Sequence, residues 1–496
     1  MKSISRRERI IAYVILFVAS VLFLLFFALW ESPFFKHWYG CDASFFSMAG
    51  RGITKGWVPY VDFFDLKGPY FFFIQALSQL IHTDRIGVWI TEIPFCYASF
   101  ILIYEICRLF VNIRKTLAVM IITVFIYIGT LWGGNTLEEY MLPILFLTLF
   151  LTLKYSITYT EDNEDFDINL TSLPWFVPIV TGIGFGIIAF SKITVGAPIA
   201  GIVITVCITD LMKKDYKAVF KYLGLCLIGV IISVAPVIIY FAYNNALSQM
   251  LYCVFEFAMK RSVDFSEPFN SDWELKTIGC YFAFFFAILH PKKLKRPLFI
   301  MLISMSVVTY VLLHLGVPFI YYFTTVLPVF VLSLVIFLRM YDPLVLFKSV
   351  NQFACLAILA VMLYYYAHVS LETINTVTNP GNSHWYEEDY RSALDLAKLI
   401  PEADRSSVFS FSTDMTWFEA NQMLPCYKYP INLQFFIDLD PRIETDLINY
   451  LNNTPPKWLV IGPSFCDEIP SLYEIIAEKY DCICQNDSGD LYLIRE

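Results

Sequence analysis

Eleven apolar stretches limit what this chain can fold into. Most are long enough to cross the hydrocarbon core of a bilayer as a helix, which takes about 20 residues. Only 16% of the 496 residues are charged and 57% are hydrophobic, whereas about 25% of a soluble domain is charged. We therefore predict a polytopic α-helical membrane protein. The expected spans are residues 10–30, 86–107, 116–132, 138–155, 174–190, 193–211, 218–243, 277–290, 297–314, 318–338 and 351–369.

The first span follows a basic segment from Lys2 to Arg9 and precedes no small-residue cleavage site. We expect a retained helix rather than a signal peptide. With alternate threading, the segments on the N-terminal side of the membrane hold more than twice as many Lys and Arg residues as the others. The positive-inside rule then predicts a cytoplasmic N-terminus. The odd number of spans predicts an extracytoplasmic C-terminus.

Charge becomes frequent again after the last span. We expect a transmembrane module over residues 1–371 and a soluble extracytoplasmic α/β domain over residues 372–496. Its predicted strands are Ser407–Ser412, Lys457–Gly462 and Leu491–Ile494, and its predicted helices are Tyr386–Ile400 and Ile469–Lys479.

Four cysteines of that domain would meet an oxidising environment outside the cytoplasm, so a disulfide is one reading of them. They are Cys426, Cys466, Cys482 and Cys484. The chain has no P-loop, no GxGxxG motif after a strand and no HExxH motif. It also has no basic stripe that would indicate a nucleic-acid partner.

Ionisable residues gather in the long loop between the first two spans, residues 31–85. Apolar residues recur at helical spacing over residues 42–55, which predicts an amphipathic helix on the membrane surface. A second short helix is expected at Pro69–Ile81. Charge near a membrane exit is costly and usually functional.

Asp42 opens the first of these helices. A carboxylate at the membrane–water boundary suits a general base that takes a proton from an acceptor hydroxyl. An aspartate in this position also makes a good helix N-cap. Both readings are compatible with the sequence.

Three charged residues and a tyrosine follow: Tyr60, Asp62, Asp65 and Lys67. Lys67 beside Tyr60 would bind a lipid phosphate that arrives from the bilayer. The alternative is a local ion pair with a lysine that reaches along the apolar surface to water.

Two further charged groups lie at the expected outer ends of later spans. Glu138 and Glu139 begin the fourth span, where they complement the helix dipole or converge with Asp42 to hold an acceptor or a divalent cation. Lys192 ends the fifth span, either as an interfacial anchor or as a phosphate ligand.

The chain resembles the GT-C superfamily of integral membrane glycosyltransferases. Within it, the chain is most similar to the bacterial branch related to protein O-mannosyltransferases and lipid A aminoarabinose transferases. Members of this branch have an acid after the first span, a G-x-x-P-Y-x-D-x-x-x-x-K-G-P stretch, and a second acid at the outer start of the fourth span. The matching residues are Asp42, Gly56, Pro59, Tyr60, Asp62, Lys67, Gly68, Pro69 and Glu138 or Glu139.

The resemblance implies an inverting transfer of a sugar from a polyprenyl-phosphate donor to a lipid-linked, glycan or protein acceptor. It assigns Asp42 as the base and Lys67, with Tyr60, as the donor-phosphate site. Some members use a divalent cation, which Glu138 and Glu139 would hold here. Two features depart from the pattern: the second acid is a Glu pair, and the aromatic–histidine stretch of some members is only loosely matched by residues 314–322.

Three other functions remain open from the sequence. A flippase or transporter of lipid-linked saccharides would place charges at mid-membrane depth, whereas here they gather at one edge. A glycan polymerase or ligase usually has an Arg-rich late outer loop, and residues 244–276 hold only two lysines and one arginine. An inactive scaffold that presents the C-terminal domain would not need Asp42.

Overall fold

The computed structural model places most of the chain. The described residues are 5–159, 165–261, 271–315, 319–341, 349–379, 384–411, 415–429, 433–462 and 469–495.

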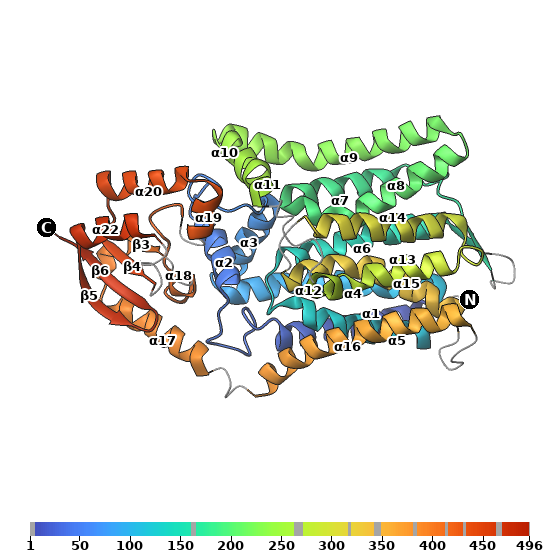
Figure 1. The fold of residues 1–496 in the computed structure, drawn as a ribbon, viewed down its shortest axis with the longest axis horizontal. Coiled ribbons are helices and arrows are strands. Elements are labelled where there is room, and N and C mark those ends of the chain that lie inside the picture. The colour runs from blue at the N-terminus through green and yellow to red at the C-terminus, as the bar shows by residue number, and fades with distance from the viewer. Residues whose placement is uncertain are drawn as a thin grey trace.

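A bundle of long helices forms the body of the molecule (Figure 1). Eight helical stretches among the described residues are long and apolar enough to cross a membrane, so the protein is a polytopic helical membrane protein. The bundle helices are α1 (Arg6–Phe27), α4 (Arg85–Phe110), α5 (Ile113–Leu131), α6 (Leu137–Ser156), α7 (Phe176–Lys192), α8 (Ala197–Met212), α9 (Tyr216–Tyr243), α13 (Ile278–Leu289), α14 (Arg296–Leu313), α15 (Leu327–Met340) and α16 (Val350–Thr378).

Each of the eleven expected spans coincides with one of these helices, although their lengths differ. α13 has only 12 residues. α7 and α8 form one apolar run, Phe176–Met212, but Lys192 has extended backbone angles between them. Lys213, just after α8, donates to Thr171, just before α7. The start of α7 and the end of α8 therefore lie at the same end of the bundle, and the two helices run in opposite directions.

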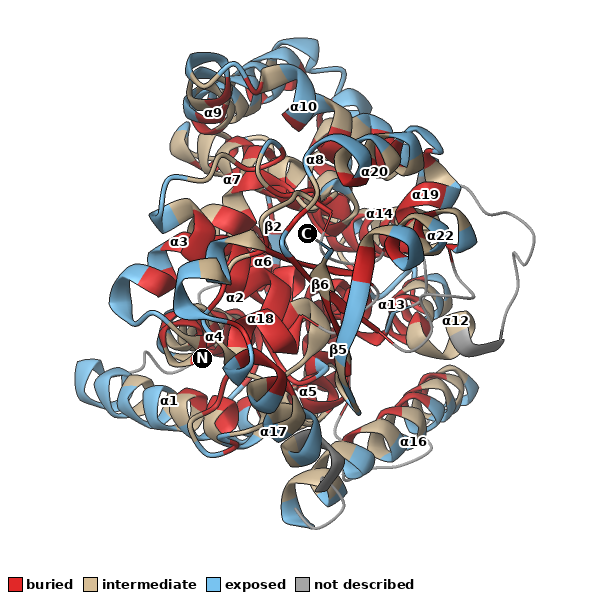
Figure 2. Cartoon of the chain, turned by 90° about the vertical axis from the view of Figure 1, so that its left-hand side faces the viewer, coloured by how far each residue is buried: buried red, intermediate tan, exposed pale blue. Residues whose placement is uncertain are grey.

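The two ends of the bundle differ. The N-terminus lies at one end, here called the far end, and the C-terminal domain lies beyond the other, here called the domain end (Figure 1). The stretch 320–338 at the centre is buried throughout, whereas fewer than a third of the residues of α1, α9 and α16 are buried and these helices lie at the rim of the molecule (Figure 2). Such an arrangement leaves their apolar surfaces to face lipid. That the far end is cytoplasmic remains the prediction of the positive-inside rule.

Short elements cover the domain end. α2 begins at Cys41 rather than at residue 42, and all of its residues from Ala43 to Gly52 are buried. We expected this helix to lie along the membrane surface, but α3 covers one side of it and the C-terminal domain another. The elements here are α2 (Cys41–Thr54), α3 (Pro69–Ile81), α10 (Leu247–Leu251), η2 (Tyr252–Phe257), α11 (Ala258–Arg261), α12 (Ser271–Lys276) and η3 (Ile320–Val326), with η1 (Ile193–Gly196) between α7 and α8.

The C-terminal domain is built around a four-stranded mixed sheet of order β3-β4-β6-β5, in which only β3 and β4 are parallel. The expected boundary at residue 371 falls inside α16, which continues to Thr378. The elements are α17 (His384–Lys398), η5 (Glu402–Ser407), β3 (Val408–Phe411), α18 (Thr416–Ala420), α19 (Leu433–Leu439), α20 (Arg442–Asn453), β4 (Trp458–Ile461), α22 (Pro470–Lys479), β5 (Tyr480–Asn486) and β6 (Gly489–Ile494).

The sequence does not predict the strands that are exposed or very short. β5 is an edge strand in which most residues after Tyr480 are exposed, so it lacks the apolar run that marks β3 and β4. The hairpin of β1 (Ile157–Tyr159) and β2 (Phe166–Ile168) at the far end is too short to leave a pattern. Cys426, Cys482 and Cys484 are free thiols, and Cys466 lies outside the described residues.

α7 and α9 pack at close range through glycines. A Cβ atom at Gly229 would overlap the carbonyl oxygen of Ile179, and one at Gly182 would overlap that of Cys226. Small residues at such crossings let helix backbones approach. Gly224, one and a half turns earlier in α9, has open space around its Cα.

The Gly229→Val substitution is expected to destabilise the bundle by on the order of 2 kcal/mol or more, because the overlap is with backbone. Thermal unfolding of the detergent-purified protein measures this. Gly224→Val is the matched control on the same helix and is expected to unfold near the wild-type temperature. Equal midpoints for the two variants would contradict the close packing.

Candidate functional site

A cavity of about 580 Å³ lies between the domain end of the bundle and the C-terminal domain. Its walls come from the loop after α1, the start of α2, the Asp65–Lys67 segment, the turn before α6 and the ends of α7 and η3. Five of the eight residues singled out from the sequence line it. They are Asp42, Asp65, Lys67, Glu138 and Lys192. Residues that are far apart in the sequence therefore do converge.

Asp42 lies in the first turn of α2, whose N-cap is Gly40. Its side chain makes no capping bond, so the N-cap reading is wrong. Among the described residues, its carboxylate has no hydrogen-bond or ion-pair partner. It is half-buried and lines the cavity. A carboxylate in this state is available to accept a proton.

Lys67 projects into the same cavity and is held there by its neighbours. Its Nζ lies 3.6 Å from Asp65 Oδ2 and 4.5 Å from the centre of the Phe46 ring. Its backbone N–H donates to Asp65 Oδ1 at 2.6 Å. The ammonium group is thus paired with Asp65, and the residue lines the cavity.

A second lysine approaches the cavity from the junction of α7 and η1. Lys192 Nζ donates to Glu138 Oε1 at 2.7 Å and lies 2.8 Å from the centre of the Tyr322 ring. Glu138 is almost fully buried, whereas about a fifth of the Lys192 side chain remains exposed. The pair places the Lys192 ammonium group at the cavity wall, and the buried Glu138 carboxylate balances its charge.

The other three candidate residues support the site without lining it. Tyr60 is buried, has a left-handed φ of 70° and donates from its hydroxyl to the Lys67 carbonyl at 2.7 Å; burial raises the pKa of this phenol. Asp62 accepts the Val58 N–H at 2.6 Å. Glu139 accepts from the Thr136 hydroxyl at 2.7 Å.

Asn135 joins four helices beneath the cavity. Its backbone N–H donates to Glu92 of α4 at 2.6 Å, and its side chain contacts the Ala43 carbonyl of α2 at 3.2 Å. Its Oδ1 accepts from Gln75 of α3 at 2.6 Å and from Tyr140 of α6 at 3.0 Å. The residue also lines the cavity and is 1% exposed.

Arg85, the first residue of α4, shapes the segment that leads from α1 to Asp42. Its guanidinium donates to the carbonyls of Trp30 at 3.1 Å and Trp38 at 2.5 Å, and also to that of Phe35. Sequence reasoning counted Arg85 only as one more charge in a loop. No local sequence pattern indicates that a residue will bind carbonyl groups about fifty positions away in the chain.

Aromatic residues complete the cavity wall. Trp30, Trp132, Phe319, Tyr321, Tyr322, Phe435 and Phe436 line it. Tyr321 and Tyr322 belong to the stretch 314–322 that only loosely matches the aromatic–histidine stretch of the family, and both line the cavity. His314 lies outside the cavity and stacks on Trp273. The signal for the tyrosines was present in the sequence, whereas Phe435 and Phe436 come from the C-terminal domain without any motif.

The acid pair does not fit a divalent cation. Glu138 is bound to Lys192, and Glu139 is bound to Thr136. Across the described part of the chain, no group of three or more His, Cys, Asp or Glu side chains is placed to hold a metal ion.

Glu31 provides a pH-dependent test of the site. Its side chain is 2% exposed, its Oε2 atom has no partner, and burial raises its pKa well above the ordinary value. A folded state that binds an extra proton loses stability as the pH rises above the unfolded pKa of about 4.3. The Gln side chain of Glu31→Gln does not titrate. As the pH rises from 5.5 to 8, the midpoint of thermal unfolding of wild type is therefore expected to fall relative to that of Glu31→Gln.

The control for this prediction is Glu478→Gln, since Glu478 is exposed at the end of α22. Its unfolding midpoint is expected to follow that of wild type at every pH. A Glu31→Gln curve parallel to wild type would mean that Glu31 is ionised in the folded protein.

No family model matches the chain, and no curated protein matches its sequence. Solved structures do match its fold. The crystal structure of ArnT from Cupriavidus metallidurans bound to undecaprenyl phosphate superposes with a TM-score of 0.62 and 12% sequence identity, covering 97% of each chain. The apo crystal structure of the same protein gives 0.60 and 14%, covering 97% of this chain and 98% of that one.

The match spans the bundle and the C-terminal domain together, so it concerns the whole architecture rather than a helix bundle in general. ArnT is a GT-C lipid A aminoarabinose transferase. The resemblance drawn from the sequence motifs is therefore confirmed at the level of the fold. This chain has the fold seen in the two ArnT crystal structures.

Proposed function

We propose that this protein is a membrane glycosyltransferase that takes a sugar from a polyprenyl-phosphate donor. The single observation that carries the proposal is the composition of the cavity. Asp42, whose carboxylate has no hydrogen-bond or ion-pair partner among the described residues, shares it with two lysines, Lys67 and Lys192. The ArnT-like fold supports this reading, because the matched ArnT structure holds undecaprenyl phosphate.

The reaction needs a base and a cation at separate points. The acceptor oxygen attacks the anomeric carbon of the sugar and inverts it, while the bond from that carbon to the phosphate oxygen breaks. The electron pair leaves with the lipid phosphate, where the Lys67 ammonium stabilises the charge. The proton of the acceptor hydroxyl passes to the Asp42 carboxylate.

Lys192 and Glu138 act as a pair in this proposal. Lys192 adds a second cation to the wall, and buried Glu138 fixes its position at 2.7 Å. Tyr60 and Asp65 hold the backbone and side chain of Lys67, whereas Asp62 holds the Val58 N–H in the loop before it. No step requires a divalent cation.

The position of the cavity supports an interfacial enzyme over a transporter. Its lining residues come from helix ends and from the domain, whereas a transporter binds its substrate near mid-depth. A lipid phosphate held at the bilayer surface would reach the cavity from the side. The acceptor would reach it from the space outside the bilayer.

Asp42→Asn is expected to lower the rate of sugar transfer by at least two orders of magnitude, because a general base is lost. The measurement is transfer of labelled sugar from polyprenyl-phosphate donors to the lipid and glycan fractions of membranes. Asp62→Asn is the matched control, because an amide oxygen can still accept the Val58 N–H. It is expected to retain most activity.

Full activity of Asp42→Asn would remove the assignment of the base. Equal losses in the two variants would indicate that the loop, rather than the Asp42 carboxylate, matters. Consumption of no polyprenyl-phosphate sugar by wild type, across hexose, pentose and amino-sugar donors, would argue against the transferase itself.

Lys67→Met is expected to raise the KM for the donor by roughly tenfold or more, since a charge-assisted contact to the phosphate is lost. The KM for the acceptor should change little. Lys55→Met removes an exposed lysine at the end of α2 and serves as the control. A donor KM equal to that of the control would exclude Lys67 from the phosphate site.

A further inference from the structure

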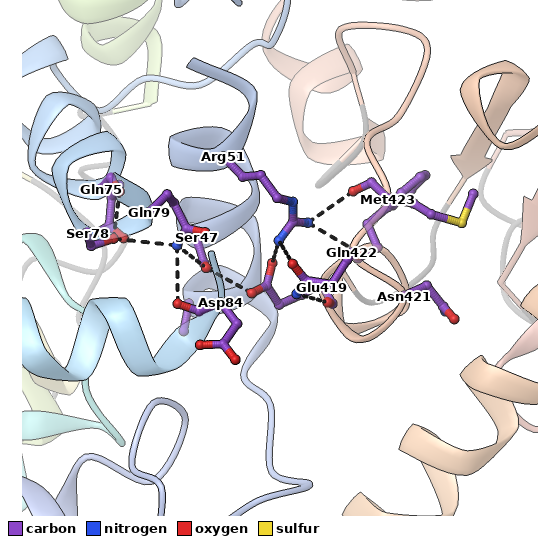
Figure 3. Close-up of polar contacts among 12 residues, drawn as sticks. Ser47, Arg51, Gln75, Ser78, Gln79, Asp84, Glu419, Asn421, Gln422 and Met423 are labelled. Carbon is purple, nitrogen blue, oxygen red and sulfur yellow. Dashed lines mark hydrogen bonds and ion pairs between the residues drawn. The ribbon is translucent and has the colours of Figure 1, made fainter. Parts of the chain in front are cut away.

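A buried arginine fastens α2 to the C-terminal domain. Arg51 lies in the last turn of α2 and is 2% exposed. Its guanidinium donates to Glu419 Oε2 at 2.7 Å and to Gln422 Oε1 at 3.2 Å, and to the Met423 carbonyl at 3.0 Å. Figure 3 shows these partners converging on Arg51 from α18 and the turn that follows it.

The partner carboxylate is equally enclosed. Glu419 belongs to α18 and is 1% exposed. Its Oε1 accepts from Ser47 Oγ of α2 at 2.9 Å, and Ser47 in turn accepts from Gln79 of α3 at 3.0 Å (Figure 3). Both oxygens of Glu419 are thus bound by the membrane module.

Two further contacts hold the domain around the cavity. The Phe64 N–H donates to the Lys428 carbonyl at 2.8 Å, two residues before the cavity residue Leu66. Asp440, at the end of α19, pairs with Lys260 at 3.2 Å and accepts from the Tyr252 hydroxyl.

The domain does more than rest on the bundle, because it supplies part of the cavity. Phe435 and Phe436 of α19 line the same space as Asp42 and Lys67. Phe436 packs on Phe64, with ring centres 5.0 Å apart. These rings form the wall opposite the bilayer, on the side from which a substrate outside the membrane would enter.

The chemistry of the Arg51–Glu419 contact points to positioning rather than to adhesion alone. A buried ion pair gains little stability over a well-packed apolar contact, because both charges lose their hydration. Its directional bonds instead fix one orientation. α2 carries Arg51 at one end and Asp42 near the other, about 14 Å away at 1.5 Å per residue.

We propose that Arg51 and Glu419 are positioning residues that hold the C-terminal domain so that Phe435 and Phe436 close the cavity over Asp42. In terms of the transferase proposed above, on which this part rests, the closed wall orients the acceptor and keeps water away from the donor. The closure itself is independent of that function.

Cys41 offers a direct readout of closure, since it precedes Asp42 and lines the cavity. Its rate of labelling by a maleimide, measured by mass spectrometry on the purified full-length protein, is expected to rise several-fold in Glu419→Ala. It should rise also in Phe435→Ala, which opens the wall and leaves the ion pair intact. Glu419→Gln, which keeps hydrogen-bonding atoms, should lie between wild type and Glu419→Ala.

Asp404→Asn is the matched control. Asp404 pairs with Lys457 inside the C-terminal domain at 2.8 Å, so its loss leaves the contact with α2 untouched and Cys41 labelling unchanged. Cys107 and Cys280 are buried in the bundle and report global unfolding. If Cys107 and Cys280 become labelled in Glu419→Ala, that variant is unfolded, and Cys41 labelling in Glu419→Gln and Phe435→Ala then tests the proposal.

The proposal is overturned if Cys41 is labelled at the wild-type rate in both Glu419→Ala and Phe435→Ala. In transfer assays, Glu419→Ala should raise the acceptor KM and the ratio of donor hydrolysis to transfer, with the donor KM unchanged. A donor KM that rises as much as the acceptor KM would contradict the assignment of the wall to the acceptor. If Cys41 labelling changes as expected but the wild-type protein transfers no sugar, the closure of the cavity is supported and the transferase function is contradicted.

Discussion

The hydrogen bonds of Asn135 are the contact on which the domain end of this protein depends. One side chain and one N–H group link α2, α3, α4 and α6, and these four helices carry or flank every charged residue of the cavity except Lys192. Buried polar groups are costly unless they are bonded. The fourfold bonding of Asn135 therefore fixes where those helices meet.

Charge balance around the cavity follows the same rule. Lys67 has Asp65 behind it, Lys192 has Glu138, and Arg51 has Glu419. Each cation is paired with a buried acid, and both lysines line the cavity. Asp42 is the exception, since no described residue neutralises it. A site of this kind keeps one group reactive while its neighbours remain fixed.

The sequence predicted the features that depend on local pattern. The eleven bundle helices, the two short helices around Asp42 and three of the four sheet strands left apolar runs or helical spacing. The convergence of Asp42 with Glu138 was one of two readings of the place of Glu138 at the outer start of the fourth span, and the resemblance added Lys67 to the same site. Arg85, Asn135 and Phe435 were missed, because their partners lie far away in the chain. Burial of α2 was missed because an amphipathic pattern does not say whether water, lipid or protein covers the polar side.

The turn between α5 and α6 has a consequence for tracing relatives of this chain. Trp132, Gly133, Gly134 and Asn135 all have positive φ values, from 54° to 100°. Glycine and asparagine tolerate this backbone and most residues do not. The constraint comes from chain geometry and not from any substrate. A Gly-Gly-Asn turn ahead of paired acids can therefore mark the architecture in divergent sequences whose sugars and acceptors differ.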